Sequence, residues 1–190
     1  MRLTMKIGVL AVQGAFIEHE HMIEEIGHTA IEIRQRDDLD GLDGLILPGG
    51  ESTVQGQLLN KLDMMKDIKN MISNGLPTLA TCAGLILLSE HIADDDTVHI
   101  GTLPVTIKRN AYGRQLSSFV TNADIKHIGN YPMTFIRAPY IENVRDGVEV
   151  LASVDNHIVA AKYNNQIGLS FHPELTGDTR IHEYFLSTIK

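Results

Sequence analysis

The chain has 190 residues, 43% of them hydrophobic and 21% charged, so it can bury a core without the help of disulfides or metal ions. Its 16 basic and 24 acidic residues leave a net charge of −8 at pH 7, which disfavours nucleic acid and anionic membranes as partners. No apolar run approaches the ~20 residues of a membrane-spanning helix, and a single cysteine without an export signal favours the reducing cytoplasm.

The first half of the chain alternates short apolar runs with amphipathic segments. Residues 6–12 are apolar almost without interruption, which is typical of a strand buried on both faces. Residues 16–26 then place apolar side chains at helical spacing, including Phe16, His19 and Ile23. The alternation continues with expected strands at 30–33, 44–47 and 78–81, and with helical segments within 53–73 and 83–89.

The second half has a different texture, with short β-rich runs separated by polar turns, and it looks more antiparallel. Strands are expected at 103–107, 133–136, 148–154, 158–161 and 167–171, and a closing helix at 178–189. Together these elements predict one domain over residues 1–190, with an α/β fold: a doubly wound, mostly parallel sheet flanked by helices, with an antiparallel extension. Sites in such sheets lie at the carboxyl ends of strands.

Cys82 lies between an expected strand and an expected helix. The small residues around it, Ala80 to Gly84, are similar in pattern to the strand-to-helix elbow that presents the nucleophile of hydrolases. At a helix N-terminus, unpaired N–H groups and the helix dipole stabilise a thiolate. The alternative is that Cys82 is a small apolar core residue without a chemical role.

His172 and Glu174 follow the last expected strand, with Pro173 between them. Proline favours extended backbone at the preceding residue, and in an extended chain side chains two apart point to the same side. The carboxylate can then orient the imidazole as a base for a nearby thiol. Ordinary surface or core positions are expected for four other histidines, namely His19, His21, His28 and His91.

Residues 48–52, Pro-Gly-Gly-Glu-Ser, follow the third expected strand. Glycines there allow backbone N–H groups to approach a ligand and form an oxyanion hole. The alternative is a tight turn before a helix that Ser52 or Thr53 caps. The loop lacks the Gly-Lys-Ser/Thr of a phosphate-binding loop. Because this loop, the cysteine and the His-Glu pair each follow a strand, we expect them to meet in one site for acyl transfer.

These motifs resemble the class I glutamine amidotransferases, and within them the family of glutaminase subunits of pyridoxal 5′-phosphate synthase. The similarity covers nearly the whole chain, from residues 8–16 through 48–53 and 81–84 to 171–175. Two further segments, residues 109–115 and 135–139, resemble those that distinguish these subunits from the amidotransferases of histidine, tryptophan or nucleotide synthesis. The resemblance implies a flavodoxin-like fold of the class I amidotransferase type.

The resemblance also assigns roles to residues. It implies that Cys82 is the nucleophile, His172 the general acid and base, and Glu174 the orienting partner of His172. The residues that match the glutamine-contacting positions are Gly50, Glu51, Ser52, Arg109, Ile136 and Arg137. Arginines, backbone groups and an acid suit the carboxylate and the ammonium of a zwitterion, whereas a solvated surface pair is the alternative for the two arginines. No metal or cofactor is expected.

We expect Cys82 to attack the carboxamide of L-glutamine while N–H groups near Gly50 and Ala83 hold the oxyanion. His172 protonates the departing ammonia and then activates the water that releases glutamate from the thioester. The resemblance implies that a synthase subunit in a large hetero-oligomer uses the ammonia, with a pentose phosphate and a triose phosphate, to make pyridoxal 5′-phosphate. It further implies weak hydrolysis without that partner.

Three departures from the family pattern stand out. Ala80 replaces a frequent glycine, Val120 replaces a frequent glutamate, and residues 1–4 precede the usual start. Ala80 suits the turn unless a positive φ is needed there. Two alternatives remain open: an amidotransferase subunit of another pathway, and a catalytically silent regulatory subunit in which Cys82 only packs.

Overall fold

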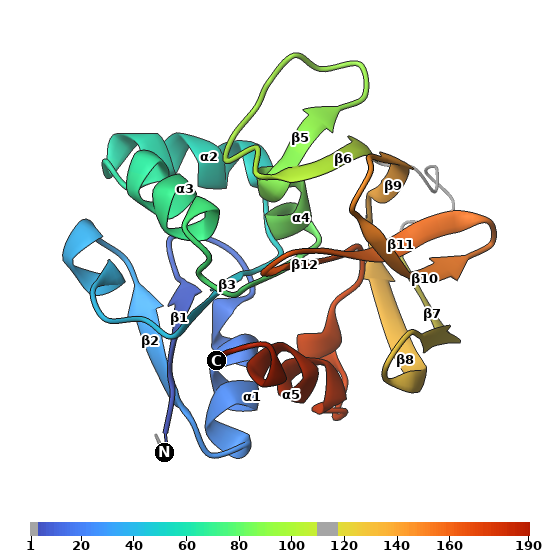
Figure 1. Cartoon of the computed structure of the whole chain (residues 1–190), viewed down its shortest axis with the longest axis horizontal. Coiled ribbons are helices and arrows are strands. Elements are labelled where there is room, and N and C mark those ends of the chain that lie inside the picture. Colours follow the sequence, from blue (N-terminus) through green and yellow to red (C-terminus); the bar gives the residue numbers. More distant parts are fainter. Residues whose placement is uncertain (1–3, 110–117) are drawn as a thin grey trace.

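The computed structural model describes residues 4–109 and 118–190. Helices and strands alternate in the first half of the chain, and strands dominate the second half (Figure 1). The strands are β1 (Lys6–Leu10), β2 (Thr29–Ile33), β3 (Gly44–Leu47), β4 (Thr78–Thr81), β5 (Ser89–Ile92), β6 (Leu103–Lys108), β7 (Ser118–Ile125), β8 (Gly129–Ile136), β9 (Tyr140–Val144), β10 (Glu149–Val154), β11 (His157–Tyr163) and β12 (Gln166–Leu169). The helices are α1 (Phe16–Glu25), α2 (Ser52–Lys61), α3 (Met65–Ser73), α4 (Ala83–Leu88) and α5 (Arg180–Ser187), with short 3₁₀ helices η1 (Arg36–Leu39) and η2 (Pro173–Leu175).

Ten of the described strands form one sheet, in the order β2-β1-β3-β4-β12-β11-β9-β6-β5, with β10 paired to β11 beside this path. The pairs from β2 to β12 are parallel. Beyond β12 the pairs β12-β11, β11-β9 and β9-β6 are antiparallel. The predicted α/β sheet with an antiparallel extension is therefore confirmed.

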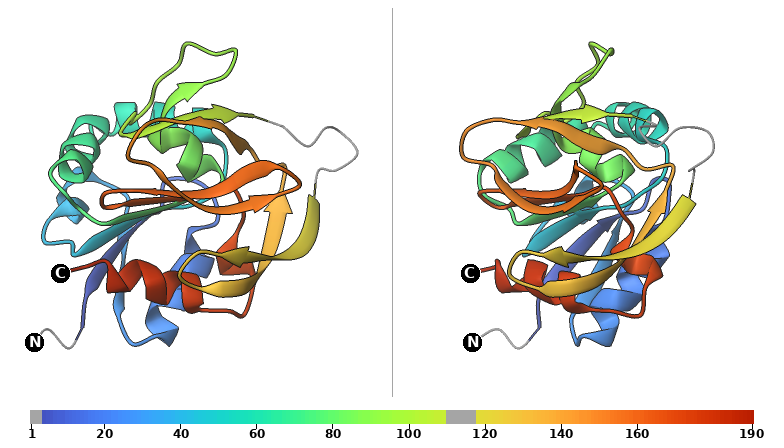
Figure 2. Two further views of the ribbon diagram at one scale, coloured as in Figure 1. Left: turned by 45° about the vertical axis from the view of Figure 1, so that its right-hand side comes forward. Right: turned by 90° about the vertical axis from the view of Figure 1, so that its right-hand side faces the viewer.

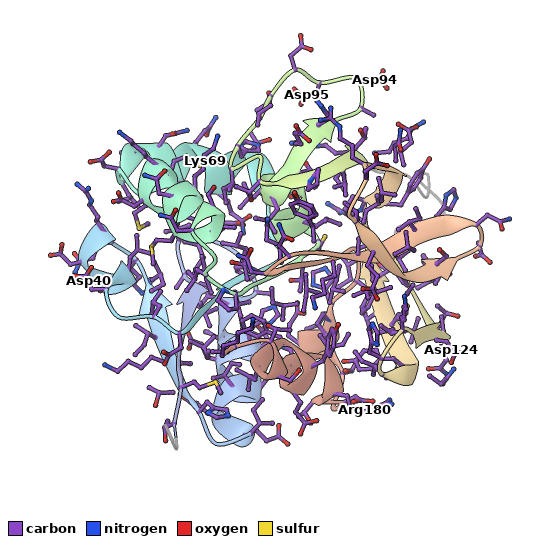
Figure 3. All side chains as sticks on the ribbon, in the orientation of Figure 1. Asp40, Lys69, Asp94, Asp95, Asp124 and Arg180 are labelled. Carbon is purple, nitrogen blue, oxygen red and sulfur yellow. The ribbon has the colours of Figure 1, made fainter. Side chains whose placement is uncertain are left out.

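Helices cover both faces of the sheet, with α1 and α5 on one face and α2, α3 and α4 on the other (Figures 1 and 2). Adjacent residues of a strand point to opposite faces, so Ile46 joins the core under α1 and α5 while Leu47 joins the core under α2 to α4. This two-sided burial explains the uninterrupted apolar runs of β1 and β3. The charged side chains of Asp40, Lys69 and Asp124 point outward (Figure 3).

The strands β7 and β8 form a separate antiparallel hairpin on the α5 side of the sheet (Figure 2). Tyr131 and Phe135 of β8 are buried in the same core as Phe171 and Phe185. Val120, one of the departures from the family pattern, lies on β7 and is 70% exposed. The packing of β8 thus places Ile136, at the end of that strand, near the main sheet.

Three strands, β5, β7 and β9, were not predicted. The segment that begins at Ser89 was assigned to the end of a helix, but α4 ends at Leu88, and the Ser89 hydroxyl donates to the Ile86 carbonyl at 2.8 Å. Strand β7 alternates exposed and half-buried side chains, and β9 buries only Ile141 fully, so neither has a strong apolar pattern. In the part of the chain described, no helix combines the length and the apolar character that a membrane span requires.

Candidate active site

The predicted site residues come together where several parallel strands end. Cys82 follows β4 directly, the loop 48–51 follows β3, and His172 lies shortly after β12, which neighbours β4. All three line one open cavity with a volume of ≈ 750 Å³. Gln13 and Ala15, which follow β1, complete the same wall. The carboxyl ends of these strands meet at one edge because the strands are parallel, as the sequence predicted.

Cys82 occupies a sharp turn between β4 and α4. Its backbone has φ +50° and ψ −103°, which is uncommon for a residue other than glycine, and its N–H donates to the Leu169 carbonyl at 2.8 Å. A Cβ at Gly84 would lie 2.0 Å from the Leu47 carbonyl oxygen, so only glycine allows α4 to pack this closely on β3. Ala80 is not among the residues with positive φ, so its departure from the family glycine does not strain the turn.

His172 is hydrogen-bonded to the predicted acid and lines the same cavity as the predicted nucleophile. Its Nδ1 lies 2.6 Å from Glu174 Oε1. Because the carboxylate accepts this hydrogen bond, Nδ1 carries a proton, and the other ring nitrogen, Nε2, faces the cavity. Burial lowers the pKa of His172, but hydrogen bonds with Cys82 and Glu174 outweigh burial and raise this pKa from 6.5 to about 10. The imidazole is therefore protonated at neutral pH beside the cysteine, and it can donate a proton to a leaving group.

The His-Pro-Glu geometry arises differently from the prediction. His172 itself is extended, but Pro173 begins the 3₁₀ helix η2, so Glu174 reaches the imidazole through a tight turn and not through extended chain. Cys82 is 7% exposed, yet it lines the cavity, with its Sγ 3.9 Å from the Ile136 carbonyl oxygen. The cysteine is thus packed and also accessible from the cavity. A cysteine that served only as a core residue would not need this access.

The loop after β3 depends on its two glycines. A Cβ at Gly49 would lie 2.4 Å from His172 Cε1, and Gly50 has φ +156° with no space for a Cβ beside Gln13 Oε1. The Ala15 N–H donates to the Gly49 carbonyl at 3.0 Å, and the Glu51 N–H donates to Gln13 Oε1 at 2.9 Å. The segment after β1 therefore holds this loop against the imidazole.

Ser52 does not cap helix α2. Glu51 occupies the cap position without a side-chain cap bond, and Ser52 is the first helical residue. The Ser52 hydroxyl instead accepts a hydrogen bond from Arg109 Nη2 at 3.2 Å, and Arg109 Nη1 lies 3.7 Å from Asp95 Oδ2. The expected capping of this helix by Ser52 or Thr53 is therefore wrong, because both residues lie within α2 and no side chain caps it.

The remaining predicted contacts lie around the cavity. Ile136 and Arg137 line it from the end of β8, and Arg137 has φ +45°. Glu51 and Arg109 line the same cavity. Residues 110–115 of the predicted family segment lie outside the described residues. Within 4–109 and 118–190, no three His, Cys, Asp or Glu side chains are grouped to hold a metal ion.

Sequence reasoning gave no role to three buried or half-buried side chains that support this site. Gln13 bonds to the loop after β3, and Gln55 Nε2 donates to the Gln13 and Pro48 carbonyls at 3.1 and 3.2 Å. His19, as expected, is a core residue, but its Nε2 lies 3.4 Å from Glu174 Oε2. The available signals were the position of Gln13 at a strand end and a polar His19 on the apolar face of α1.

The buried histidines predict acid sensitivity of the fold. Burial lowers the pKa of His182 from 6.5 to about 4, and it also lowers the pKa of its neighbour His19. Between pH 6.5 and about 4 the unfolded chain binds a proton at position 182 that the folded chain does not, so stability falls as the pH falls. For His182 alone, the free energy of unfolding should be about 2 kcal/mol lower at pH 5 than at pH 7.

Urea unfolding at the two pH values measures this difference, and His182→Gln is the control. Glutamine cannot titrate, but its amide can donate to His19 as an imidazole N–H does. The raised pKa of His172 contributes stability that is full below pH 6.5 and falls progressively from there to about pH 10, which opposes the trend from His182. Because both proteins keep His172, this contribution cancels in the difference between them. An equal pH dependence in the two proteins would contradict the assignment to His182.

Comparisons with known proteins point to one family for this chain. The profile of the SNO glutamine amidotransferase family matches residues 9–190. A protein of Desulfitobacterium hafniense (strain Y51), named pyridoxal 5′-phosphate synthase subunit PdxT, is 59% identical over 186 residues, which cover 97% of this chain and 94% of the relative. A protein of the same name from Streptococcus pneumoniae (strain ATCC 700669 / Spain 23F-1) is 51% identical over 190 residues, with 98% of both chains covered.

Solved structures lead to the same assignment. A crystal structure of a glutamine amidotransferase has a TM-score of 0.93 to this chain at 38% identity, with 96% of this chain and 98% of that chain covered. The similarity therefore includes the antiparallel extension as well as the parallel sheet. Since sequence and structure match over almost the full length, the chain belongs to the SNO glutamine amidotransferase family.

Proposed function

We propose that residues 1–190 form a single glutamine amidotransferase domain that hydrolyses L-glutamine to L-glutamate and ammonia. The observation that carries the proposal is the hydrogen bond between His172 and Glu174 at the wall of the cavity that Cys82 also lines. A thiol, an imidazole and an orienting carboxylate are the groups that acyl transfer needs. The cysteine also lies on the strained turn that presents nucleophiles, with the glycine loop facing it.

The cavity offers complementary groups for each end of a glutamine molecule. Arg109 and Arg137 supply positive charge for the α-carboxylate, and Glu51 supplies negative charge for the α-ammonium. Ser52, bonded to Arg109, and Ile136, whose carbonyl oxygen lies 3.9 Å from Cys82 Sγ, line the same cavity. The side-chain amide of the substrate would then lie between Cys82 and the loop after β3.

The reaction follows from this placement. Cys82 Sγ, as thiolate, forms a bond to the carboxamide carbon, and the C–N bond breaks as His172 gives its proton to the departing nitrogen, which leaves as ammonia. His172, now neutral, takes a proton from water as the water oxygen bonds to the same carbon. The C–S bond then breaks, and glutamate leaves with the thiolate restored.

Two backbone groups are assigned to the oxyanion. Ala83 is the first residue of α4, where helix geometry leaves N–H groups without a partner. The Gly49 carbonyl accepts a hydrogen bond from Ala15. The N–H of Gly50, in the same peptide unit, has no hydrogen-bond acceptor within the described parts of the chain. Both residues line the cavity on the side of Cys82. Such fixed donors lower the barrier by stabilising charge that appears only during the reaction.

We further propose that the ammonia passes to a pyridoxal 5′-phosphate synthase subunit within a large hetero-oligomer. The names of the relatives at 51% to 59% identity support this partner. The synthase subunit would join the ammonia with a pentose phosphate and a triose phosphate. Because the attacking group is a free thiol, the proposal places the reaction in a reducing compartment, the cytoplasm.

Ammonia release from glutamine, measured with and without the synthase subunit, tests the assignment. We expect slow release from the isolated chain and at least about tenfold faster release in the complex, since docking can order a catalytic loop. An amidotransferase of another pathway would show no activation by this partner. A silent regulatory subunit would release no ammonia in either sample, and Cys82 would not react with a glutamine-like electrophile.

A further inference from the structure

A chain of buried polar groups extends from the triad acid into the core. His19 of α1 has no exposed surface, and its Nδ1 lies 2.9 Å from His182 Nε2 on α5. On the other side of the ring, His19 Nε2 lies 3.3 Å from Thr81 Oγ1 and 3.4 Å from Glu174 Oε2. Thr81 is the residue before Cys82. His19 therefore touches both the triad acid and the neighbour of the nucleophile.

Glu174 needs a partner beyond His172. Its side chain is completely buried, and while Oε1 accepts from His172, Oε2 makes no well-aligned hydrogen bond to any described residue. A neutral His19 with its proton on Nε2 places that N–H dipole 3.4 Å from the charge on Oε2, while the same nitrogen also contacts Thr81 Oγ1 at 3.3 Å. A buried carboxylate with one uncompensated oxygen is costly, so this contact matters to the ionised form.

The two buried histidines determine each other's tautomers. Burial lowers the pKa of both rings, so both are neutral at pH 7 and only one can donate across the 2.9 Å contact. If His19 donated through Nδ1, its bare Nε2 could accept from the Thr81 hydroxyl but would face the Glu174 carboxylate, and His182 would bury an unpaired N–H. If His182 donates through Nε2, then His19 presents Nε2–H to Glu174, and only the lone pair of His182 Nδ1 stays unpaired. The second arrangement is favoured by electrostatics and by hydrogen bonding.

We propose that His19 is a positioning residue for the catalytic acid, with its Nε2–H tautomer set by His182. The inference rests on the proposed function, since it assigns His19 to the same reaction. His19 fixes the free oxygen of Glu174, so that Oε1 remains aligned on His172 Nδ1 and Nε2 of that imidazole remains aligned on Cys82. Small misplacement of such groups lowers the rate of the chemical step with little effect on substrate binding.

Two substitutions of His19 separate this role from packing. His19→Gln keeps an amide N–H near the place of imidazole Nε2, whereas His19→Leu keeps apolar volume and removes the donor. His21→Leu is the matched control, because it makes the same change on the exposed side of the same helix. All three full-length proteins are assayed for glutamine hydrolysis in complex with the synthase subunit, after thermal unfolding has shown that they are folded.

We expect His19→Leu to lower kcat between about 10- and 100-fold, with KM for glutamine changed less than about twofold. His19→Gln should recover kcat to within about threefold of the unmodified protein, and His21→Leu should leave kcat unchanged. The far-downfield proton signal of His172 Nδ1–H should weaken in His19→Leu and persist in His19→Gln. Unchanged kcat in folded His19→Leu, or an equal loss in both His19 variants, would overturn the proposal.

A second measurement needs neither a variant nor turnover. The nitrogen NMR shifts of the unmodified chain report which ring nitrogen of each histidine carries the proton, and we expect protonated Nε2 and bare Nδ1 for His19. A proton on His19 Nδ1 would overturn the inference even if the enzyme is active. Absence of ammonia release from the unmodified complex would instead overturn the proposed function, so the two failures are distinguishable.

Discussion

Replacing Cys82 with alanine is expected to lower glutamine hydrolysis by about 10⁴-fold or more, because the sequence has no second cysteine to form the acyl intermediate. The fold should survive, since the side chain is small and the loss of a sulfur leaves little empty volume. Alanine must still adopt the positive φ of this turn, as cysteine already does. Ammonia release in the synthase complex and circular dichroism of the same sample measure the two outcomes.

Cys82→Ser provides a matched comparison, because it keeps a hydroxyl in the place of the thiol. We expect serine to be nearly as inactive as alanine, since an alcohol is much harder to ionise than a thiol beside the same imidazole. Neither variant should be labelled by a glutamine-like electrophile. Hydrolysis by Cys82→Ala at a rate near that of the unmodified protein would remove the assignment of the nucleophile.

Replacing His172 with asparagine is expected to be almost as severe, with a loss of about 10³-fold or more. The asparagine amide can take the place of Nδ1 and donate to Glu174, so the buried carboxylate keeps a partner and the protein should fold. What disappears is the imidazole that takes the proton of the thiol and then gives a proton to the departing ammonia. The rate of Cys82 alkylation at neutral pH should fall together with the rate of hydrolysis.

The comparison with His127→Asn separates this effect from a general loss of charge. His127 is exposed and hydrogen-bonded to Glu149 at 2.7 Å, so it forms a similar His-Glu pair far from the cavity. Its replacement should leave hydrolysis and thiol reactivity unchanged. If His172→Asn altered stability but not the rate per folded molecule, then the raised pKa of His172 would reflect a structural pair and not a catalytic one.

Local sequence determined much of the parallel half of the fold. Runs such as 44–47 are apolar because both faces of their strands are covered. The apolar run alone therefore predicts a buried strand, whichever helices cover it. Glycines after a strand, the small residues around Cys82 and the proline after His172 also act through local backbone geometry. Since parallel strands share one edge for their carboxyl ends, their order along the chain was enough to predict a shared site.

Several features were decided only by tertiary packing. Strands β5, β7 and β9 have weak apolar patterns and form because neighbouring strands and the core offer them partners. The turn that joins His172 to Glu174, and the positive φ at Cys82 instead of at Ala80, depend on how α4 and η2 pack against the strand ends. Local rules predicted the residues involved but not the conformation that brings them into contact.

The same distinction applies to the side chains around the triad. The types and order of Cys82, His172 and Glu174 in the sequence were sufficient to predict a nucleophile, a base and an acid, because that chemistry depends on residue type. His19 was one of nine histidines, and only the packing of α1 against η2 and α5 gives it a contact with Glu174. Residue identity is local information, whereas a buried hydrogen-bond partner from a distant helix is created by the folded core.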